Sequence, residues 1–218
     1  MCRDYGLAIS VAVVVAFLIR FFLLEAYRVP STVMSPALMP GDTIFVFKSA
    51  YWLRLPGAEA PVMSLGEAKR GDVVIYTHPL EGGADFVRRV VGLPGDRVEV
   101  RNGTLYLNER TVRLVGAQDP DAQCDAEGFS GGLTYRVCST GEPGLSIPPT
   151  LVPEGQIFVL GDDRSIVLNE PRRVISSLVS IKYLRGKVLW IWLSVEPGKH
   201  ADRSWFSRIR FDRMFRRV

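Results

Sequence analysis

The sequence contains few residues of the kinds that bind metal ions, with two His and three Cys among 218 residues. A structural zinc site takes four such ligands, so we expect no metal centre, and nothing in the sequence indicates another cofactor. Three Cys are also too few for a disulfide-rich miniature fold. With a hydrophobic fraction of 47%, the chain is long enough to bury the core of one or two domains.

Excess positive charge is confined to one end of the chain. The whole sequence has 27 Lys and Arg against 23 Asp and Glu, a net charge of +4. Residues 203–218 hold six Arg and one Asp, a net of +5, which leaves about −1 on residues 1–202. The main body therefore lacks the broad basic surface typical of proteins that bind nucleic acid.

A long apolar run extends from Gly6 to Leu24, and Arg20 is its only charged residue. A helix of these 19 residues spans roughly 28 Å, enough for the core of a bilayer. Residues 25–27 do not supply the small residues of a signal-peptide cleavage site, and a soluble core helix is rarely apolar on every face. We therefore predict one transmembrane anchor within residues 1–26 and an exported body.

Short segments of β-branched and aromatic residues, bounded by Gly, Pro and Asp, follow at residues 43–48, 73–77, 86–91, 97–100, 111–115, 157–160 and 187–193. These segments are typical of strands, and Asn102-Gly103 predicts a hairpin turn. No amphipathic helix separates them, as parallel βαβ units would require. We predict a mainly β, antiparallel domain over residues 27–200.

Residues 116–150 are the least strand-like stretch, rich in Gly, Asp, Pro and Ser, and we expect a loop-rich insertion there. Cys124 and Cys138 are close enough in the sequence to close one loop. In an exported domain these two Cys would form a disulfide; the alternative is two unpaired, small hydrophobic side chains.

Four motifs follow the apolar run: RVPSTVMSPALMPGD at residues 28–42, RGDVVIY at 70–76, DFVRRVVGLPGDRV at 85–98 and VPEGQIFVLGDDRS at 152–165. Singly, each could be ordinary turn chemistry. In this order, after one apolar segment, they resemble the bacterial type I signal peptidases. The resemblance covers nearly the whole chain.

That resemblance implies a membrane-anchored, mainly β serine endopeptidase that removes signal peptides from exported preproteins with a Ser/Lys dyad. The Ser hydroxyl needs a neighbouring base, and a Lys can be that base only where desolvation lowers its pKa. The resemblance also implies a location at the bacterial cytoplasmic (inner) membrane, with a single pass and the main domain on the outer, periplasmic side. Expected partners are membrane lipid and an exported preprotein or signal peptide.

Both dyad positions are substituted in this sequence. The first motif has Val33 at the nucleophile position, and the third has Arg88 at the position of the general base. Val has no heteroatom that could attack a carbonyl, and Arg stays protonated in proteins. Ser31 matches the Ser of the family's oxyanion hole. We therefore expect a catalytically inactive relative, a pseudoenzyme.

The fourth motif is only partly retained. Gly161, Asp162 and Arg164 match the family pattern, whereas Val167 replaces the Ser that helps to orient the Lys and Asn169 replaces an Asp. Loss of these supporting residues together with the dyad indicates release from the demands of catalysis.

Other residues could in principle supply catalysis. If residues 30–36 are extended, Ser35 lies on the same side as Val33 but about 6–7 Å further along. His78 is the one alternative base nearby, although a lone His is more often a surface loop residue. An active protease that uses such a non-standard residue is the alternative hypothesis.

The peptide-holding positions of the family remain apolar or aromatic in this chain, with Pro as one member. They are Tyr27, Val29, Pro30, Met34, Leu38, Phe86 and Val87. They could equally be core residues at strand spacing. If the groove persists, an extended peptide could pair with a strand edge without being cleaved.

Residues 201–218 form a basic, aromatic tail. Phe211, Met214, Phe215 and Val218 would share one face of a helix, as in helices that lie on anionic lipid. A frayed basic end is the alternative. Because an exported domain would rarely meet nucleic acid, we expect no nucleic-acid partner.

Three hypotheses therefore remain. The first is an inactive relative of signal peptidase that holds or presents exported polypeptides. The second is a working signal peptidase. The third is a structural subunit that binds no peptide and pairs with an active paralogue.

Overall fold

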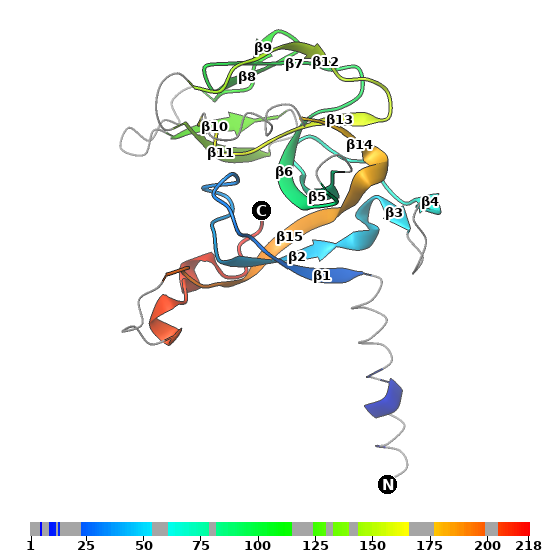
Figure 1. Ribbon diagram of the computed structural model, residues 1–218, viewed down its shortest axis with the longest axis vertical. Coiled ribbons are helices and arrows are strands. Elements are labelled where there is room, and N and C mark those ends of the chain that lie inside the picture. The colour runs from blue at the N-terminus through cyan, green and yellow to red at the C-terminus, as the bar shows by residue number, and fades with distance from the viewer. Residues whose placement is uncertain are drawn as a thin grey trace.

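Antiparallel β-strands make up nearly all of the regular structure in the described part of the chain (Figure 1). The computed structural model describes residues 5, 9–11, 13, 23–53, 61–78, 82–114, 124–129, 133–139, 144–165, 177–198 and 205–218. The prediction of a mainly β, antiparallel fold is confirmed.

The largest sheet has seven strands in the order β1-β2-β15-β5-β6-β13-β14. Their bounds are β1 (Leu24–Arg28), β2 (Asp42–Phe47), β5 (Val73–Thr77), β6 (Asp85–Gly92), β13 (Gln156–Leu160), β14 (Leu178–Ser180) and β15 (Leu184–Ser194). All neighbouring strands in it are antiparallel.

Three smaller sheets accompany it: a four-stranded sheet in the order β12-β7-β8-β9, the ribbon β10–β11 and the pair β3–β4. Their bounds are β3 (Trp52–Leu53), β4 (Met63–Ser64), β7 (Arg97–Arg101), β8 (Thr104–Leu107), β9 (Arg110–Thr111), β10 (Cys124–Gly128), β11 (Thr134–Cys138) and β12 (Ile147–Leu151). In Figure 1 the four-stranded sheet and the β10–β11 ribbon lie at one end of the molecule, and β1, β2 and β15 lie at the other. Short 3-10 turns are η1 (Lys48–Ala50) and η3 (Ile181–Tyr183).

Buried side chains cover both faces of the large sheet. On β5, Val73 belongs to one apolar cluster, and its neighbour Val74 belongs to another on the opposite face. A strand buried on both faces needs no polar alternation, which explains the apolar run VVIYT. A third cluster joins Val98 of β7 to Phe158 of β13 and so connects the two larger sheets.

The predicted hairpin turn is confirmed. Asn102 and Gly103 connect β7 to β8, with φ of 47° and 80°. Two successive positive φ angles are those of a type I′ turn, which Asn-Gly favours.

The structure differs from the expected loop-rich insertion at residues 116–150. This stretch contains β10, β11 and β12. Strand β12 includes Pro148 and Pro149, and Pro cannot donate a ladder hydrogen bond. The strand is tolerated because it lies at the edge of its sheet, where its pairing with β7 has a register shift.

The predicted disulfide is confirmed. Cys124 and Cys138 face each other across the β10–β11 ribbon and are joined through their Sγ atoms.

No helix within the described residues is long and apolar enough to cross a membrane. The predicted anchor, residues 1–26, falls largely outside the described residues.

The single helical face considered for the tail does not form. The described tail contains two short 3-10 turns, η4 (Trp205–Arg208) and η5 (Phe211–Arg213). Instead of continuing as a helix, its backbone pairs with β15. The N–H of Phe215 donates to the carbonyl of Ile191 at 2.7 Å, and the N–H of Ile191 donates to the carbonyl of Arg216 at 3.0 Å.

Candidate functional site

Arg88 and Arg89 are neighbours on β6, so their side chains point to opposite faces of the sheet. Arg89 is buried, and its Nε and Nη2 atoms donate to the two carboxylate oxygens of Asp162 at 2.8 and 2.6 Å. Its Nη1 atom donates to the carbonyl of Gly71 at 2.9 Å. Burial by itself would lower the pKa of Arg89, but the Asp162 carboxylate outweighs this effect and the pKa is raised. Arg89 is therefore a fixed structural cation.

Arg88, which stands at the family's general-base position, is half-buried. Its Nη1 atom donates to the carbonyl of Val87 at 2.7 Å, and its guanidinium carbon lies 5.8 Å from the centre of the Phe86 ring. A guanidinium only donates hydrogen bonds and stays protonated, so it cannot accept the proton of a nucleophile. It can hold an acceptor such as a peptide carbonyl.

Val33, at the nucleophile position, packs against Gly161 at the end of β13. A Cβ atom on Gly161 would lie only 2.6 Å from Val33 Cγ1 and 2.5 Å from the Val33 carbonyl oxygen. That carbonyl accepts a hydrogen bond from the N–H of Asp163 at 3.0 Å. Strand β13 pairs Leu160 with Arg89, so the next residue, Gly161, lies beside Arg88. The structure thus brings both substituted positions to the same end of β13.

Turns, and not an extended strand, carry the first motif. The N–H of Ser35 donates to the carbonyl of Thr32 at 2.7 Å, and the N–H of Leu38 donates to the carbonyl of Met34 at 2.8 Å. The extended spacing considered for Ser35 is therefore wrong, because residues 32–35 form a turn. Ser31, at the oxyanion-hole position, is half-buried.

The apolar positions taken from the family fall into four environments. Val29, Met34 and Leu38 are at most 3% exposed and belong to the first core cluster. Tyr27 and Val87 are half-buried against that same cluster. The remaining two lie elsewhere: Phe86 packs on the cluster of the opposite sheet face, and Pro30 is exposed. A bound peptide could contact the half-buried and exposed members, while the buried three support them.

A second buried ionic group ties the β10–β11 ribbon to the fourth motif. Arg164 donates to Glu127 at 2.9 Å and to the carbonyl of Gly161 at 2.7 Å. The hydroxyl of Tyr135 donates to the same Glu127 oxygen at 2.6 Å, and its ring centre lies 4.2 Å from the Arg89 guanidinium carbon. Burial, followed by the charge of Glu127, raises the pKa of Tyr135 well above its ordinary value. Sequence patterns did not indicate Glu127 or Tyr135, because both lie in the stretch expected to be loop.

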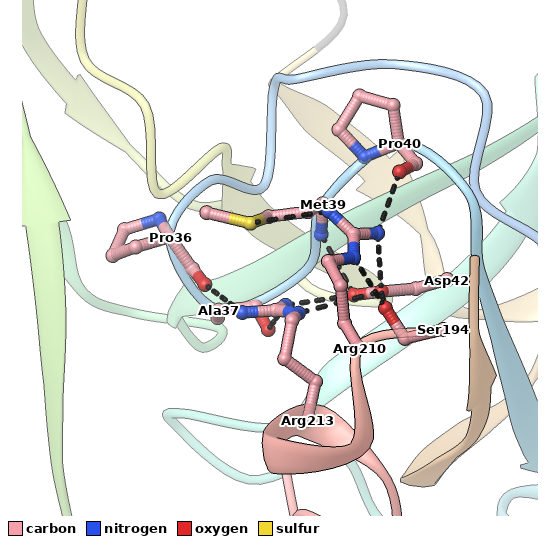
Figure 2. Close-up of polar contacts among 8 residues, drawn as sticks. All are labelled: Pro36, Ala37, Met39, Pro40, Asp42, Ser194, Arg210 and Arg213. Atoms are coloured by element: carbon pink, nitrogen blue, oxygen red, sulfur yellow. Dashed lines mark hydrogen bonds and ion pairs between the residues drawn. The ribbon is translucent and has the colours of Figure 1, made fainter. Parts of the chain in front are cut away.

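The tail arginines converge on one buried carboxylate. Figure 2 shows Arg210 and Arg213 reaching Asp42, with contacts of 3.1 and 2.7 Å. Ser194 of β15 donates to the same carboxylate at 2.6 Å. Burial would raise the pKa of Asp42, but the hydrogen bond from Arg213 and those from the backbone of Met39 and from Ser194 hold it below its ordinary value.

The same two arginines also grip the backbone of the first motif. Arg213 donates to the carbonyl of Ala37 at 3.0 Å and to that of Pro36 at 3.4 Å. Arg210 donates to the carbonyl of Pro40 at 2.8 Å (Figure 2). Residues 210–213 of the tail are thus bound to the backbone of residues 36–40, within the motif that carries Val33, and we call them the strap.

Neither His78 nor Lys187 is well placed to act as a base beside Arg88. Arg88 pairs with Val74 of β5, and His78 lies four residues beyond Val74. His78 is therefore about 13 Å along the strand from Arg88. Lys187 lies in the same cross-strand row as Val74, two strand spacings or about 10 Å from Arg88. Its Nζ atom forms an ion pair with Asp72 at 2.5 Å.

Among the described residues, no group of three or more His, Cys, Asp or Glu is arranged to hold a metal ion.

Comparisons with known proteins agree with the motifs. A family model described as signal peptidase, peptidase S26, matches residues 2–192. A curated signal peptidase I from Pseudomonas aeruginosa is 30% identical over 228 residues, which cover 94% of this chain and 78% of that protein. A signal peptidase I from Bacillus licheniformis is 39% identical over 157 residues, which cover 72% and 71% of the two chains. A crystal structure of a signal peptidase I from Enterococcus faecalis V583 is 24% identical, with a TM-score of 0.35, and the match covers 57% of this chain and 98% of that one.

Proposed function

This chain belongs to the signal peptidase family, peptidase S26, and from that premise we propose that it binds exported polypeptides at the membrane without cleaving them. The signal peptidases of this family act on exported preproteins. This chain would bind the same class of polypeptide but would not cleave it.

The observation that carries the proposal is the contact between Val33 and Gly161. The side chain at the nucleophile position is a hydrocarbon packed on Gly161 at the end of β13, and the pairing of Leu160 with Arg89 places Arg88 at this same end. Acyl transfer to a protein needs a heteroatom nucleophile and a base that can accept its proton. This pair supplies neither.

Strand β1 supports the binding part of the proposal. Within the described sheet it lies at one edge and pairs only with β2. An extended peptide can add to such an edge through main-chain hydrogen bonds. Tyr27, half-buried on β1, and the half-buried Val87, which packs on the same core cluster, would contact its side chains.

We place the β domain on the outer side of the bacterial cytoplasmic membrane, held there by one anchor within residues 1–26. The Cys124–Cys138 disulfide supports this location, because disulfides persist in oxidising compartments and are rare in the cytosol.

The decisive experiment combines a cleavage assay with photo-crosslinking. Full-length protein in detergent is incubated with a preprotein and, separately, with a signal peptide that carries a photoreactive group beside its cleavage position. We expect no site-specific cleavage, together with labelling of residues 27–38 or 86–87 that unlabelled signal peptide competes away and a scrambled peptide does not. Specific cleavage would overturn the proposal, and so would an absence of competed labelling.

An active signal peptidase is the second candidate, favoured by the names of the curated relatives at 30% and 39% identity. Ser31 and Ser35 are the two Ser residues of the first motif. Site-specific cleavage by the wild type would establish this candidate, and its loss in Ser35→Ala, with Ser31→Ala only slowed as expected for an oxyanion-hole donor, would name Ser35 as the nucleophile. Wild-type protein without cleavage excludes it.

A further inference from the structure

One edge of β6 is open along the half of the strand that ends at Arg88. Strand β5 pairs with β6 over the whole stretch from Asp85 to Arg89, whereas β13 pairs with it only from Arg89 to Gly92. In the sheet as the described residues form it, β5 and β13 are the only neighbours of β6. An extended polypeptide can add to such an edge, in line with β13.

The main chain of Val87 points toward this open edge. Along a strand of an antiparallel sheet, the N–H and C=O of successive residues point alternately to the two sides. Those of Val90 bond to the segment that leads into β5, at 2.9 Å to the carbonyl of Asp72 and at 2.7 Å to the N–H of Gly71. Three residues earlier, Val87 therefore points the other way, toward the line of β13.

Arg88 places its guanidinium at the same edge, because its Nη1 atom donates to the Val87 carbonyl at 2.7 Å. A guanidinium carries five N–H donors and can serve several acceptors at once. Its planar fork matches the two oxygens of a carboxylate. The N–H of Val87, on the same side of the strand, is a further donor for such a group.

A polypeptide that passes this point and one that ends there offer different groups to Arg88. A passing chain offers neutral peptide carbonyls, and its N–H groups compete with Arg88 for the Val87 carbonyl. A chain that ends there offers an α-carboxylate, whose charge-assisted hydrogen bonds are about twice as strong as neutral ones. Arg88 is half-buried beside the Phe86 ring, and a hydrogen bond is stronger where water is partly excluded.

The surroundings of Arg88 suit a chain end that is held and not processed. At the same end of β13, the side chain of Val33 is a hydrocarbon packed on Gly161, and it offers no nucleophile. The side chain of Val87 packs on the same core cluster as Tyr27. The last residues of a bound polypeptide would therefore meet an apolar surface.

We propose that this chain selects polypeptides that end in a free α-carboxylate, which Arg88 and the N–H of Val87 bind at the open edge of β6. The inference rests on the proposed binding of exported polypeptides and names the form that is bound. A signal peptide released from a preprotein has such an end, because hydrolysis of a peptide bond leaves a carboxylate on the N-terminal fragment. The reaction that supplies the ligand is thus the hydrolysis of a peptide bond by another enzyme.

The test compares three forms of one fluorescent signal peptide by their anisotropy on binding to the full-length protein in detergent. The first form ends in a free carboxylate at the cleavage position, the second ends there in an amide, and the third continues with further residues. We expect the free acid to bind at least about tenfold more tightly than the amide or the extended form. This comparison uses wild-type protein only, so it does not depend on the folding of a variant.

Variants locate the carboxylate. Arg88→Gln should lower the affinity for the free acid to that for the amide and leave the affinity for the amide unchanged. Arg88→Lys should keep only part of the preference, because an ammonium retains the charge but lacks the fork. Arg97→Gln is the matched control, since Arg97 is exposed on β7 of the other sheet and its loss changes the charge equally.

The outcomes separate this inference from the function on which it rests. Equal affinity of the wild type for the free acid and the amide would overturn the inference and leave peptide binding intact. A preference for the free acid that survives in Arg88→Gln would overturn it as well, because the carboxylate would then be bound elsewhere. Absence of binding for all three forms would overturn both.

Discussion

Val33 and Gly161 are packed so closely that the protein has no room for a side chain at position 161. The contact joins the first motif to the end of β13, and the Val33 carbonyl also accepts the N–H of Asp163. Val33 is thus part of the packing that holds two distant motifs together.

Gly161→Ala should destabilise the protein. The new Cβ atom would lie 2.5 Å from the Val33 carbonyl oxygen, and overpacking of this kind costs about 1–3 kcal/mol. Urea unfolding of the variant and the wild type measures the difference. Val33→Ala combined with Gly161→Ala should recover only part of the loss, because the carbonyl contact remains. Equal stability of Gly161→Ala and wild type would contradict the close packing described here.

Val33→Ser combined with Arg88→Lys should introduce weak, site-specific cleavage of a preprotein. The double variant restores a nucleophile and an amine that can be neutral, and the geometry at Gly161 brings the two positions together. Cleavage products are identified by N-terminal sequencing. Val33→Ser alone and Val33→Ala with Arg88→Lys are the controls, and both should stay silent. Cleavage by Val33→Ala with Arg88→Lys would show that position 33 does not supply the nucleophile, and cleavage by Val33→Ser alone would show that position 88 does not supply the base.

Arg213→Ala should destabilise the protein by about 1.5–3 kcal/mol, the cost of losing hydrogen bonds to a charged group, because Arg210 and Ser194 still hold the Asp42 carboxylate. Its guanidinium holds Asp42, which is fully buried, and the carbonyl of Ala37. Arg208→Ala is the control, because the Arg208 guanidinium donates to an exposed carbonyl, that of Glu196, and its loss should cost less than about 1 kcal/mol. Similar losses in both variants would show that the tail is not held mainly at Asp42.

Acid should release the strap. The pKa of an aspartate in an unfolded chain is about 3.9. In the folded protein the pKa of Asp42 is lower than this ordinary value. The unfolded chain therefore takes up the proton first as pH falls. The stability that this carboxylate contributes is complete above about pH 4 and is lost as pH falls through the folded pKa.

Urea unfolding at a series of pH values, from about 2 to about 6, checks this dependence. Asp42→Asn should be less stable than wild type at the upper end of the range and should lose stability less steeply toward the lower end. A slope as steep in Asp42→Asn as in wild type would assign the acid sensitivity to other carboxylates. Asp96, held by Arg70, is the first of these, because its pKa is also lowered.

Reduction of the Cys124–Cys138 disulfide should destabilise the β10–β11 ribbon. A cross-link between residues 14 apart contributes about 3 kcal/mol through the entropy of the unfolded chain. Unfolding is measured with and without reductant, and Cys124→Ser combined with Cys138→Ser should match the reduced wild type. An unchanged stability on reduction would mean that the ribbon is held mainly by Glu127, Tyr135 and Arg164.

Local sequence patterns were sufficient for much of the fold and for the family. Runs of β-branched residues predicted the strands, and Asn102-Gly103 predicted a hairpin, because strand and turn preferences act between residues close in the chain. The same locality explains the failures. Strand β12 was missed because its Pro148-Pro149 pair is tolerated only at a sheet edge, and an edge is a property of the whole sheet.

The sequence by itself determined that a hydrocarbon and a guanidinium stand at the two dyad positions, since those identities need no structure. Only the tertiary structure decided which of two adjacent arginines is buried on Asp162, and that Asp42 and Arg213, 171 residues apart, form an ion pair. Such pairs form only when the fold brings distant segments of the chain together. In the interior, where little water screens them, opposite charges then attract strongly. The residue spacing of the tail is that of an amphipathic helix. In the folded protein its backbone instead pairs with β15 and its Arg213 binds Asp42, and both contacts are to segments distant in the sequence.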